Sequence, residues 1–235
     1  MANAVEWAQI AQGVAERLGV RYEPVGGLNP RNGPVALCPG GTNRLTGQLD
    51  PEYWGSSCDA LEREEGGLFS KTIVPGAIVA KAHMPDLAEA TPPFNVESSA
   101  GAEDMIESRM SRNRVQFESI DFNKRFITTV PREHDPTALR ETIGPGFLDW
   151  ATGIEADVDF GVSERQLYFL WRLRERTADE YSEALRNAGE LFRRIRLEVE
   201  EHGTHTYPAG PWHAGLEPFP GANEGSDPPQ RLAGL

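Results

Sequence analysis

The sequence predicts an α+β fold in which a mainly antiparallel sheet is packed by an N-terminal helix and a long C-terminal helix, followed by a mobile C-terminal tail. Three observations predict this fold. Apolar residues recur at helical spacing near both ends of the expected domain, two β-prone segments lie close together before the last helix, and the final stretch is rich in Pro, Gly and acidic residues. We expect one domain over residues 1–203 and a flexible tail over residues 204–235.

The N-terminal helix is expected to begin at Asn3, which has capping-box spacing to Glu6. Its apolar face comprises Trp7, Ile10, Ala11, Val14 and Leu18. Gly19 is a natural helix stop, and a short strand is expected over residues 20–22. Packing against the core is favoured over a membrane-surface helix, because the polar face carries Glu and Gln rather than Lys.

The middle of the chain is expected to hold loops and short strands. Residues 24–67 are predicted to be loop-rich, because Pro and Gly recur through them. Residues 71–83 are predicted to form two strand pieces separated by a turn at Pro75 and Gly76. A short amphipathic helix is expected over residues 102–110.

Alternating apolar residues predict a strand that begins at Val115, is broken by an Asp-Phe-Asn bulge or turn near residue 122, and resumes over residues 126–130. Two short helices are expected after it, over residues 137–143 and 147–152. A Gly-Pro-Gly motif separates these two helices.

A β-hairpin is expected next. Residues 154–160 alternate apolar and acidic side chains, which predicts a half-buried strand with Glu155, Asp157 and Asp159 on its exposed face. Residues 167–171 are apolar throughout, as a central strand would be.

The last helix has the strongest periodic signal in the sequence. Thr177 and Glu180 form a capping box at its start, and Gly203 is expected to end it. Its apolar stripe continues for six turns: Tyr181, Ala184, Leu185, Ala188, Leu191, Phe192, Ile195 and Val199.

Composition excludes several functional classes. The formal net charge of −13 disfavours general binding to nucleic acid or to anionic lipid. Two clusters of basic residues could still form local patches, although charge runs are usually solvated faces: Arg109, Arg112, Arg114, Lys124 and Arg125, and Arg193, Arg194 and Arg196. No apolar run approaches the ~18 residues of a membrane span, and the N-terminus has no signal-peptide core, so we expect a cytoplasmic protein without direct membrane insertion. Cys38 and Cys58 are expected to be free thiols in loops.

Two groups of side chains could carry chemistry. Glu155, Asp157 and Asp159 could act as acid and base or bind a hard cation, or they could form the solvated face of an ordinary strand. The histidines near the end of the last helix match no zinc-site spacing: His202, His205 and His213. Nucleophile-elbow, dinucleotide-binding, phosphate-loop and paired-cysteine motifs do not occur, so the sequence assigns no catalytic residue, metal ligand or cofactor.

Aromatic and apolar residues punctuate the tail, and four of them are candidates for partner binding: Tyr207, Trp212, Leu216 and Phe219. Such anchors in an acidic, flexible segment suit a peptide that orders on a partner, although they could also contact the domain's own surface. The sequence therefore favours a non-enzymatic interaction or accessory protein that docks on a protein partner through its tail or its acidic surface. The alternatives are an enzyme of unrecognised class, such as a metal-dependent hydrolase, and a small-ligand-binding module.

Three segments carry a family resemblance: Phe117-Glu118-Ser119 with Phe122-Asn123-Lys124-Arg125-Phe126, Asp135-Pro136-Thr137-Ala138-Leu139, and Pro145-Gly146-Phe147-Leu148-Asp149-Trp150. In type and order they resemble motifs of a set of actinobacterial uncharacterised proteins related to the family called domain of unknown function 3137. The resemblance spans residues 4–196 and is clearest from residue 115 onward. Many of those relatives carry transmembrane helices, and the family supplies no catalytic residues to transfer to this sequence.

Overall fold

The computed structural model describes residues 4–24, 42–51, 53–64, 72–82, 87, 90–99, 112–163 and 166–202. Within these residues, nine strands form one sheet in which every neighbouring pair is antiparallel. In spatial order the strands are β1 (Arg21–Glu23), β2 (Thr42–Asp50), β3 (Tyr53–Glu64), β4 (Thr72–Ala82), β9 (Gln166–Arg172), β8 (Val158–Ser163), β5 (Phe94–Ser98), β7 (Phe126–Pro131) and β6 (Arg112–Val115).

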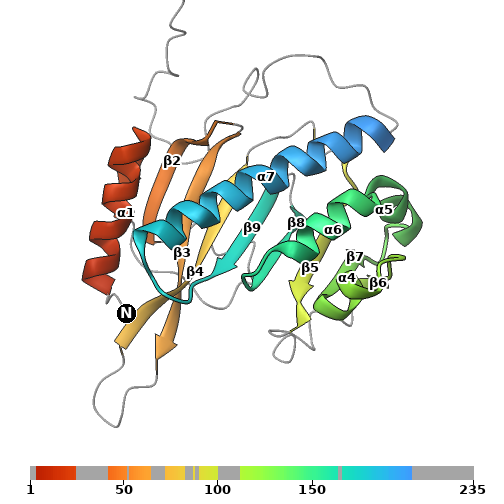
Figure 1. Cartoon of the computed structure of the whole chain (residues 1–235), viewed down its shortest axis with the longest axis horizontal. Coiled ribbons are helices and arrows are strands. Elements are labelled where there is room, and N and C mark those ends of the chain that lie inside the picture. The colour runs from red at the N-terminus through yellow and green to blue at the C-terminus, as the bar shows by residue number, and fades with distance from the viewer. Residues whose placement is uncertain are drawn as a thin grey trace, which may run out of the picture.

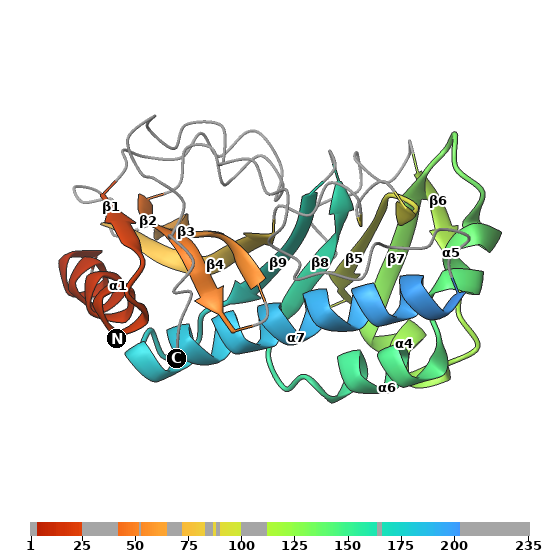
Figure 2. The same ribbon diagram turned by 90° about the horizontal axis from the view of Figure 1, so that it is seen from above.

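The helices of the described part are α1 (Ala4–Leu18), α4 (Ile120–Arg125), α5 (Pro136–Thr142), α6 (Pro145–Gly153) and α7 (Ala178–His202). Figure 2 shows α1, α4, α6 and α7 on one side of the sheet, with α7 running across the strands. In Figure 1, α1 lies at one end of the sheet, beside β2, and α5 and β6 lie at the other end. This arrangement confirms the predicted α+β fold with an N-terminal and a long C-terminal helix.

The predicted stripe of α7 is confirmed, because all eight of its apolar residues are buried. They pack against the face of the sheet formed by apolar side chains of the central strands, including Ile78, Phe160 and Phe169. The main core of the protein therefore lies between α7 and this face. In the described part of the chain, no helix is both long enough and apolar enough to cross a membrane.

The start of α7 is held by an unusual version of the predicted capping box. The N–H of Glu180 donates to Thr177 Oγ1 at 3.2 Å, as expected. The Glu180 carboxylate, however, accepts from the backbone N–H groups of Arg174, Glu175 and Arg176 at 2.7, 3.0 and 2.7 Å. One buried carboxylate therefore orders the whole connection between β9 and α7.

The predicted N-terminal helix is confirmed as α1, and Gly19 ends it with a φ of +65°, a conformation that glycine adopts without strain. The expectation for Leu18 is wrong, because its side chain is 41% exposed. The helix ends at this residue, and Val20 packs against the core instead.

The prediction of loops over residues 24–67 is wrong for β2 and β3. Both strands are rich in polar residues, which hides their alternation in the sequence, and they are held by pairing with each other and with β4. Cys58, predicted in a loop, lies in β3 and is buried with Ala77, Val79 and Leu170 in a small second cluster. Cys38 and the helix predicted over residues 102–110 lie outside the described residues.

The predicted turn at Pro75 and Gly76 is also wrong, because β4 continues through both residues. The pairing with β3 shifts here: Ala60 lies opposite Ala77, and Leu61 lies opposite Pro75. Gly76 is therefore an unopposed bulge residue. A bulge accommodates a proline inside a strand, because the regular ladder of hydrogen bonds is already interrupted there.

The segment after Val115 forms a loop and the short helix α4 rather than a continued strand. Ser119 caps α4 by accepting from the N–H of Phe122 at 3.3 Å. The Asn123 side chain accepts from the N–H of Phe117 at 3.1 Å and donates to its carbonyl at 2.6 Å. These local side-chain bonds favour the helix over the strand that the apolar alternation predicted.

The two short helices predicted after residue 136 are confirmed as α5 and α6, and the hairpin is confirmed as β8 and β9. Strand β8 begins at Val158 rather than at residue 154. The domain boundary expected at residue 203 stays a prediction, because residues 203–235 lie outside the described part of the chain.

Replacing Glu180 by Ala is expected to lower the free energy of unfolding by roughly 3 kcal/mol, because several backbone N–H groups lose a charged acceptor in a partly buried site. Glu180→Gln should lie between Glu180→Ala and the native protein, since one amide oxygen remains to accept. The measurement is urea denaturation followed by circular dichroism. Glu183→Ala, at an exposed position of the same helix, is the control, and an equal loss in both Ala variants would contradict this role for Glu180.

Candidate functional site

The four candidate partner-binding residues of the tail lie outside the described residues, as do two of the three histidines: Tyr207, Trp212, Leu216, Phe219, His205 and His213. Their role stays a prediction. The third histidine, His202, lies at the exposed end of α7, with its Nε2 3.7 Å from a carboxylate oxygen of Glu198.

The acidic face predicted for the 154–160 segment does not form as a free group of carboxylates. Glu155 is exposed, Asp157 is half-buried and Asp159 is only 2% exposed. Arg172 of the neighbouring strand donates to both carboxylate oxygens of Asp159, at 3.1 and 2.7 Å, and lies 3.7 Å from Asp157. The backbone N–H of Ser98 also donates to Asp159 at 2.9 Å.

A carboxylate held by two guanidinium bonds and a backbone N–H is neutralised and already hydrogen-bonded, so Asp159 is poorly suited to act as a base or a metal ligand. Within the described ranges, no three His, Cys, Asp or Glu side chains are grouped as a metal ion would require. Asp159 and Arg172 instead join β5, β8 and β9 on the face of the sheet opposite α7.

A buried polar network that the sequence did not indicate lies at the other end of the sheet, where α1 and α7 cover β2 and β3. At its centre, Asp59 of β3 has no exposed surface. Asn43 Nδ2 donates to Asp59 Oδ2 at 2.5 Å, and the Tyr22 hydroxyl donates to Asn43 Oδ1 at 2.8 Å. Asn43 of β2 thus binds the carboxylate directly, and Tyr22 of β1 binds it through Asn43.

Helices α1 and α7 complete this network. The Tyr181 hydroxyl of α7 lies 3.1 Å from Ser57 Oγ, and its ring stacks on Trp7 of α1 with 5.4 Å between ring centroids. The Trp7 indole N–H faces Asp59 closely enough to lower the pKa of its carboxyl, although the pair does not reach ordinary hydrogen-bond geometry.

The backbone is adapted to this network at Asn43, which has a φ of +52°. Asn tolerates this left-handed conformation better than most residues. The pairing of β2 with β3 shifts between Thr42 and Leu45, so Asn43 lies in an irregular part of the ladder. The shift in strand pairing and the left-handed backbone of Asn43 therefore occur at the residue whose amide donates to Asp59.

Burial raises the pKa of the Asp59 carboxyl to about 7, and the Asn43 amide and the Trp7 indole partly oppose this rise. Burial, together with the nearby Asp59 charge, also raises the pKa of Tyr22 and Tyr181. The network can therefore take up or release one proton near neutral pH. A lone Asp among Ser and Cys in β3 carries no local sequence pattern that could have indicated this behaviour.

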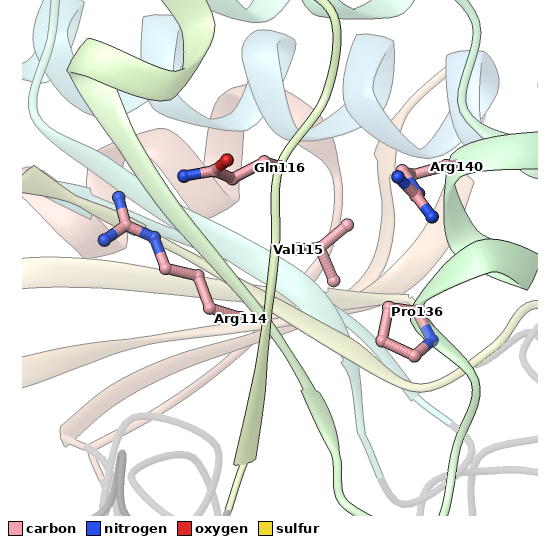
Figure 3. A pocket seen from close by; sticks show the side chains of 5 residues that line it. All are labelled: Arg114, Val115, Gln116, Pro136 and Arg140. Atoms are coloured by element: carbon pink, nitrogen blue, oxygen red, sulfur yellow. The ribbon is translucent and has the colours of Figure 1, made fainter.

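A second feature is a hollow of about 280 Å³ at the edge of the sheet, between β6 and α5 (Figure 3). Figure 3 shows Arg114 and Gln116 on one side of β6, and Val115 on the other side facing Pro136 and Arg140. Among the described strands β6 pairs only with β7, so its second edge has no neighbouring strand there. Of the described side chains of the basic clusters predicted from the sequence, that of Arg114 lines this hollow.

Neither arginine of the hollow forms an ion pair with a described residue, although Asp135 lies close to Arg140: hydrogen bonds from Thr137 lower the pKa of the Asp135 carboxyl, and the Arg140 charge adds to this lowering. Arg114 is exposed and has no side-chain partner there. Arg140 is exposed and donates one hydrogen bond, to Thr137 Oγ1 at 3.3 Å. The hollow is therefore locally positive on a chain whose net charge is −13.

Comparison with known proteins gives one structural likeness. No protein-family model matches the chain, and no curated protein matches it. The crystal structure of the mycobacterial trehalose monomycolate transport factor A, TtfA, resembles this chain with a TM-score of 0.49 and 12% sequence identity, covering 82% of this chain and 95% of that chain. A likeness this distant assigns neither a family nor a function, and the resemblance to the domain of unknown function 3137 family stays a prediction.

Replacing Asp59 by Asn is expected to flatten the dependence of stability on pH. The folded protein holds a proton on Asp59 up to pH of about 7, whereas the unfolded chain releases it near 3.8. The native free energy of unfolding should therefore fall as pH rises between these values, by up to about 4 kcal/mol. Asp59→Asn removes the charge and should be the more stable protein at pH 8.

The measurement is urea denaturation at pH 5, 6, 7 and 8. Glu155→Gln, which removes a carboxylate from an exposed position, is the control and should keep the native slope. An unchanged slope in Asp59→Asn would show that another group causes the pH dependence.

Proposed function

We propose that this chain is a non-enzymatic accessory protein that docks on a protein partner, with the β6 edge and its hollow binding an extended, acidic segment of that partner. The observation that carries the proposal is the combination of a strand edge that is unpaired among the described strands with two exposed arginines that line one hollow and form no ion pair in the described part of the chain. The predicted relation to the actinobacterial family is part of the same proposal, since that family supplies no catalytic residues.

The strand edge supplies the backbone part of the docking surface. An edge strand presents N–H and C=O groups that a partner strand can use to extend the sheet. Here β6 is four residues long, and Arg112–Val115 pair with β7 on one edge only among the described strands. A short edge of this kind can accept a short extended segment in one register.

The arginines supply the selectivity. Arg114 and Arg140 project from different elements around one hollow, and both are exposed. Carboxylates of a partner strand could form charge-assisted hydrogen bonds with them, which are about twice as strong as neutral ones. The acidic remainder of this chain would repel acidic segments elsewhere, so charge would direct such a segment to the hollow.

The tail could contact the same partner. The last turn of α7 lies near α5, because Glu198 accepts from the N–H of Gly144 at 2.8 Å, just after α5 ends. The chain therefore leaves α7 at the end of the sheet that holds the hollow (Figure 1). We include the four apolar tail residues in the proposal as a second contact region: Tyr207, Trp212, Leu216 and Phe219.

The proposal predicts that a fluorescent peptide alternating Glu and Val binds the full chain, and that a peptide alternating Lys and Val does not. Arg114→Gln and Arg140→Gln should each weaken binding about tenfold, because each removes a charge-assisted bond. Fluorescence anisotropy measures the affinity. Arg186→Gln, on the exposed surface of α7, is the control and should leave it unchanged. Equal binding of both peptides, or no effect of either hollow variant, would contradict docking at β6.

A full-length variant with Ala at all four tail positions separates the two contact regions. It should keep its affinity for the Glu-Val peptide, since the hollow lies in the described domain. If it loses that affinity, the tail rather than the hollow binds the peptide, and the β6 edge is not the docking site.

A further inference from the structure

The interface between α1 and the sheet is mostly apolar but contains one polar contact. Trp7 is fully buried between Tyr181 and the sheet, with Ala11, Val14 and Ala15 along the same helix face. Its indole Nε1 is directed at the carboxylate of Asp59. The helix that lies at the end of the sheet therefore covers the one fully buried carboxylate among the described residues.

The polar atoms at this contact are incompletely bonded. Trp7 Nε1, Asp59 Oδ1 and Thr42 Oγ1 are buried and have no hydrogen bond of ordinary geometry. Thr42 lies directly opposite Asp59 in the pairing of β2 with β3. A protonated carboxyl can donate a hydrogen bond, and Thr42 Oγ1 is an acceptor in the right part of the network. An ionised carboxyl cannot donate and needs more donors than it has here.

Several elements face Asp59, and among the described residues none contributes a cation to it. The groups that surround it are Trp7 from α1, Tyr22 from β1, Thr42 and Asn43 from β2, Ser57 and Cys58 from its own strand, Ile78 opposite on β4, and Tyr181 from α7. The titratable groups of this set are two tyrosines and a thiol, which are neutral at pH 7 in their ordinary range. An ionised Asp59 is therefore stabilised by dipoles alone, and its charge is costly to bury.

Helix α1 is linked to the rest of the described chain by a short connection at its C-terminal end. It is the first described element, and Gly19 joins it to the three-residue strand β1. Its removal would expose Asp59 to water, where the ionised form is favoured. The state with α1 docked therefore prefers a protonated Asp59, and the state with α1 released prefers an ionised one.

We propose that Asp59 is a proton-dependent switch for α1: the protonated carboxyl keeps α1 docked on the sheet, and loss of the proton favours its release. Release would uncover the apolar face of α1 together with the polar network on β2 and β3. By linkage, the population of the released state should rise as the pH increases from 5 to 8, by roughly a hundredfold if Asp59 becomes fully exposed.

Hydrogen exchange of the backbone amides in the full chain tests this inference. After correction for the intrinsic exchange rate, protection of the α1 amides should fall by up to roughly a hundredfold from pH 5 to pH 8. At each pH it should also be lower than protection in the middle of α7, whose amides exchange through global unfolding. In Asp59→Asn, protection of α1 should be independent of pH. Glu155→Gln is the control and should behave like the native protein.

A second variant keeps the test decisive if Asp59→Asn folds poorly. Trp7→Phe retains an aromatic ring against Tyr181 but removes the indole N–H that favours the ionised form. Ionisation of Asp59 should therefore require a higher pH in Trp7→Phe than in the native protein. Carbon NMR of the Asp59 carboxyl measures this shift as an upward move of its titration midpoint. Protection of α1 that does not change with pH, equal pH dependence in Asp59→Asn, or protection of α1 equal to that of α7 at every pH would each overturn the proposal.

Discussion

The structure depends on the burial of the apolar stripe of α7 against one face of the sheet. This helix contacts β2, β3, β4 and β9 as well as α1, α5 and α6, so it bridges elements that are far apart in the sequence. Burying its large side chains contributes on the order of 10 kcal/mol before the loss of chain entropy is counted. Without this helix, the apolar face formed by β3, β4 and β9 would lose its main cover.

The same helix connects the two features described at opposite ends of the sheet. Near its start, Tyr181 packs on Trp7 and lies next to Ser57 in the Asp59 network. Near its end, Glu198 bonds to Gly144 beside α5, which forms one wall of the hollow. A change in how α7 sits on the sheet would therefore reach both the buried carboxyl and the proposed docking surface, through a single rigid element.

The two faces of the sheet differ in their chemistry. The face toward α7 is apolar except for the Asp59 network, whereas the opposite face carries buried charged groups, including Lys81, Glu97 and Asp159. Asp159 is paired with Arg172, so its charge is compensated; Asp59 has no such partner and is compensated by protonation instead. The two buried Asp residues of the sheet thus differ in how their charge is compensated, because β9 supplies an arginine to Asp159 and no described strand supplies a cation to Asp59.

Local signals account for most of what could be predicted. The stripe and capping box of α7, the Gly19 stop of α1 and the Gly-Pro-Gly break between α5 and α6 act over a few residues, and all were recovered from the sequence. The Phe-Glu-Ser segment shows the limit of this approach. Its apolar alternation is equally consistent with a strand, and the capping bonds of Ser119 and Asn123 decide for a helix.

By itself, then, the sequence determined helices α1, α5, α6 and α7, the central hairpin and the α+β class, because periodicity and capping depend on residues close together in the chain. Only the tertiary structure decided that β2 and β3 are strands, that Pro75 lies in a bulge, and that Asp159 is neutralised by Arg172. It also decided that Asp59 is buried beside Trp7 and that Arg114 and Arg140 line one hollow. Each of these depends on pairing between segments distant in the sequence, and the physical properties of such a site come from neighbours that no local pattern specifies.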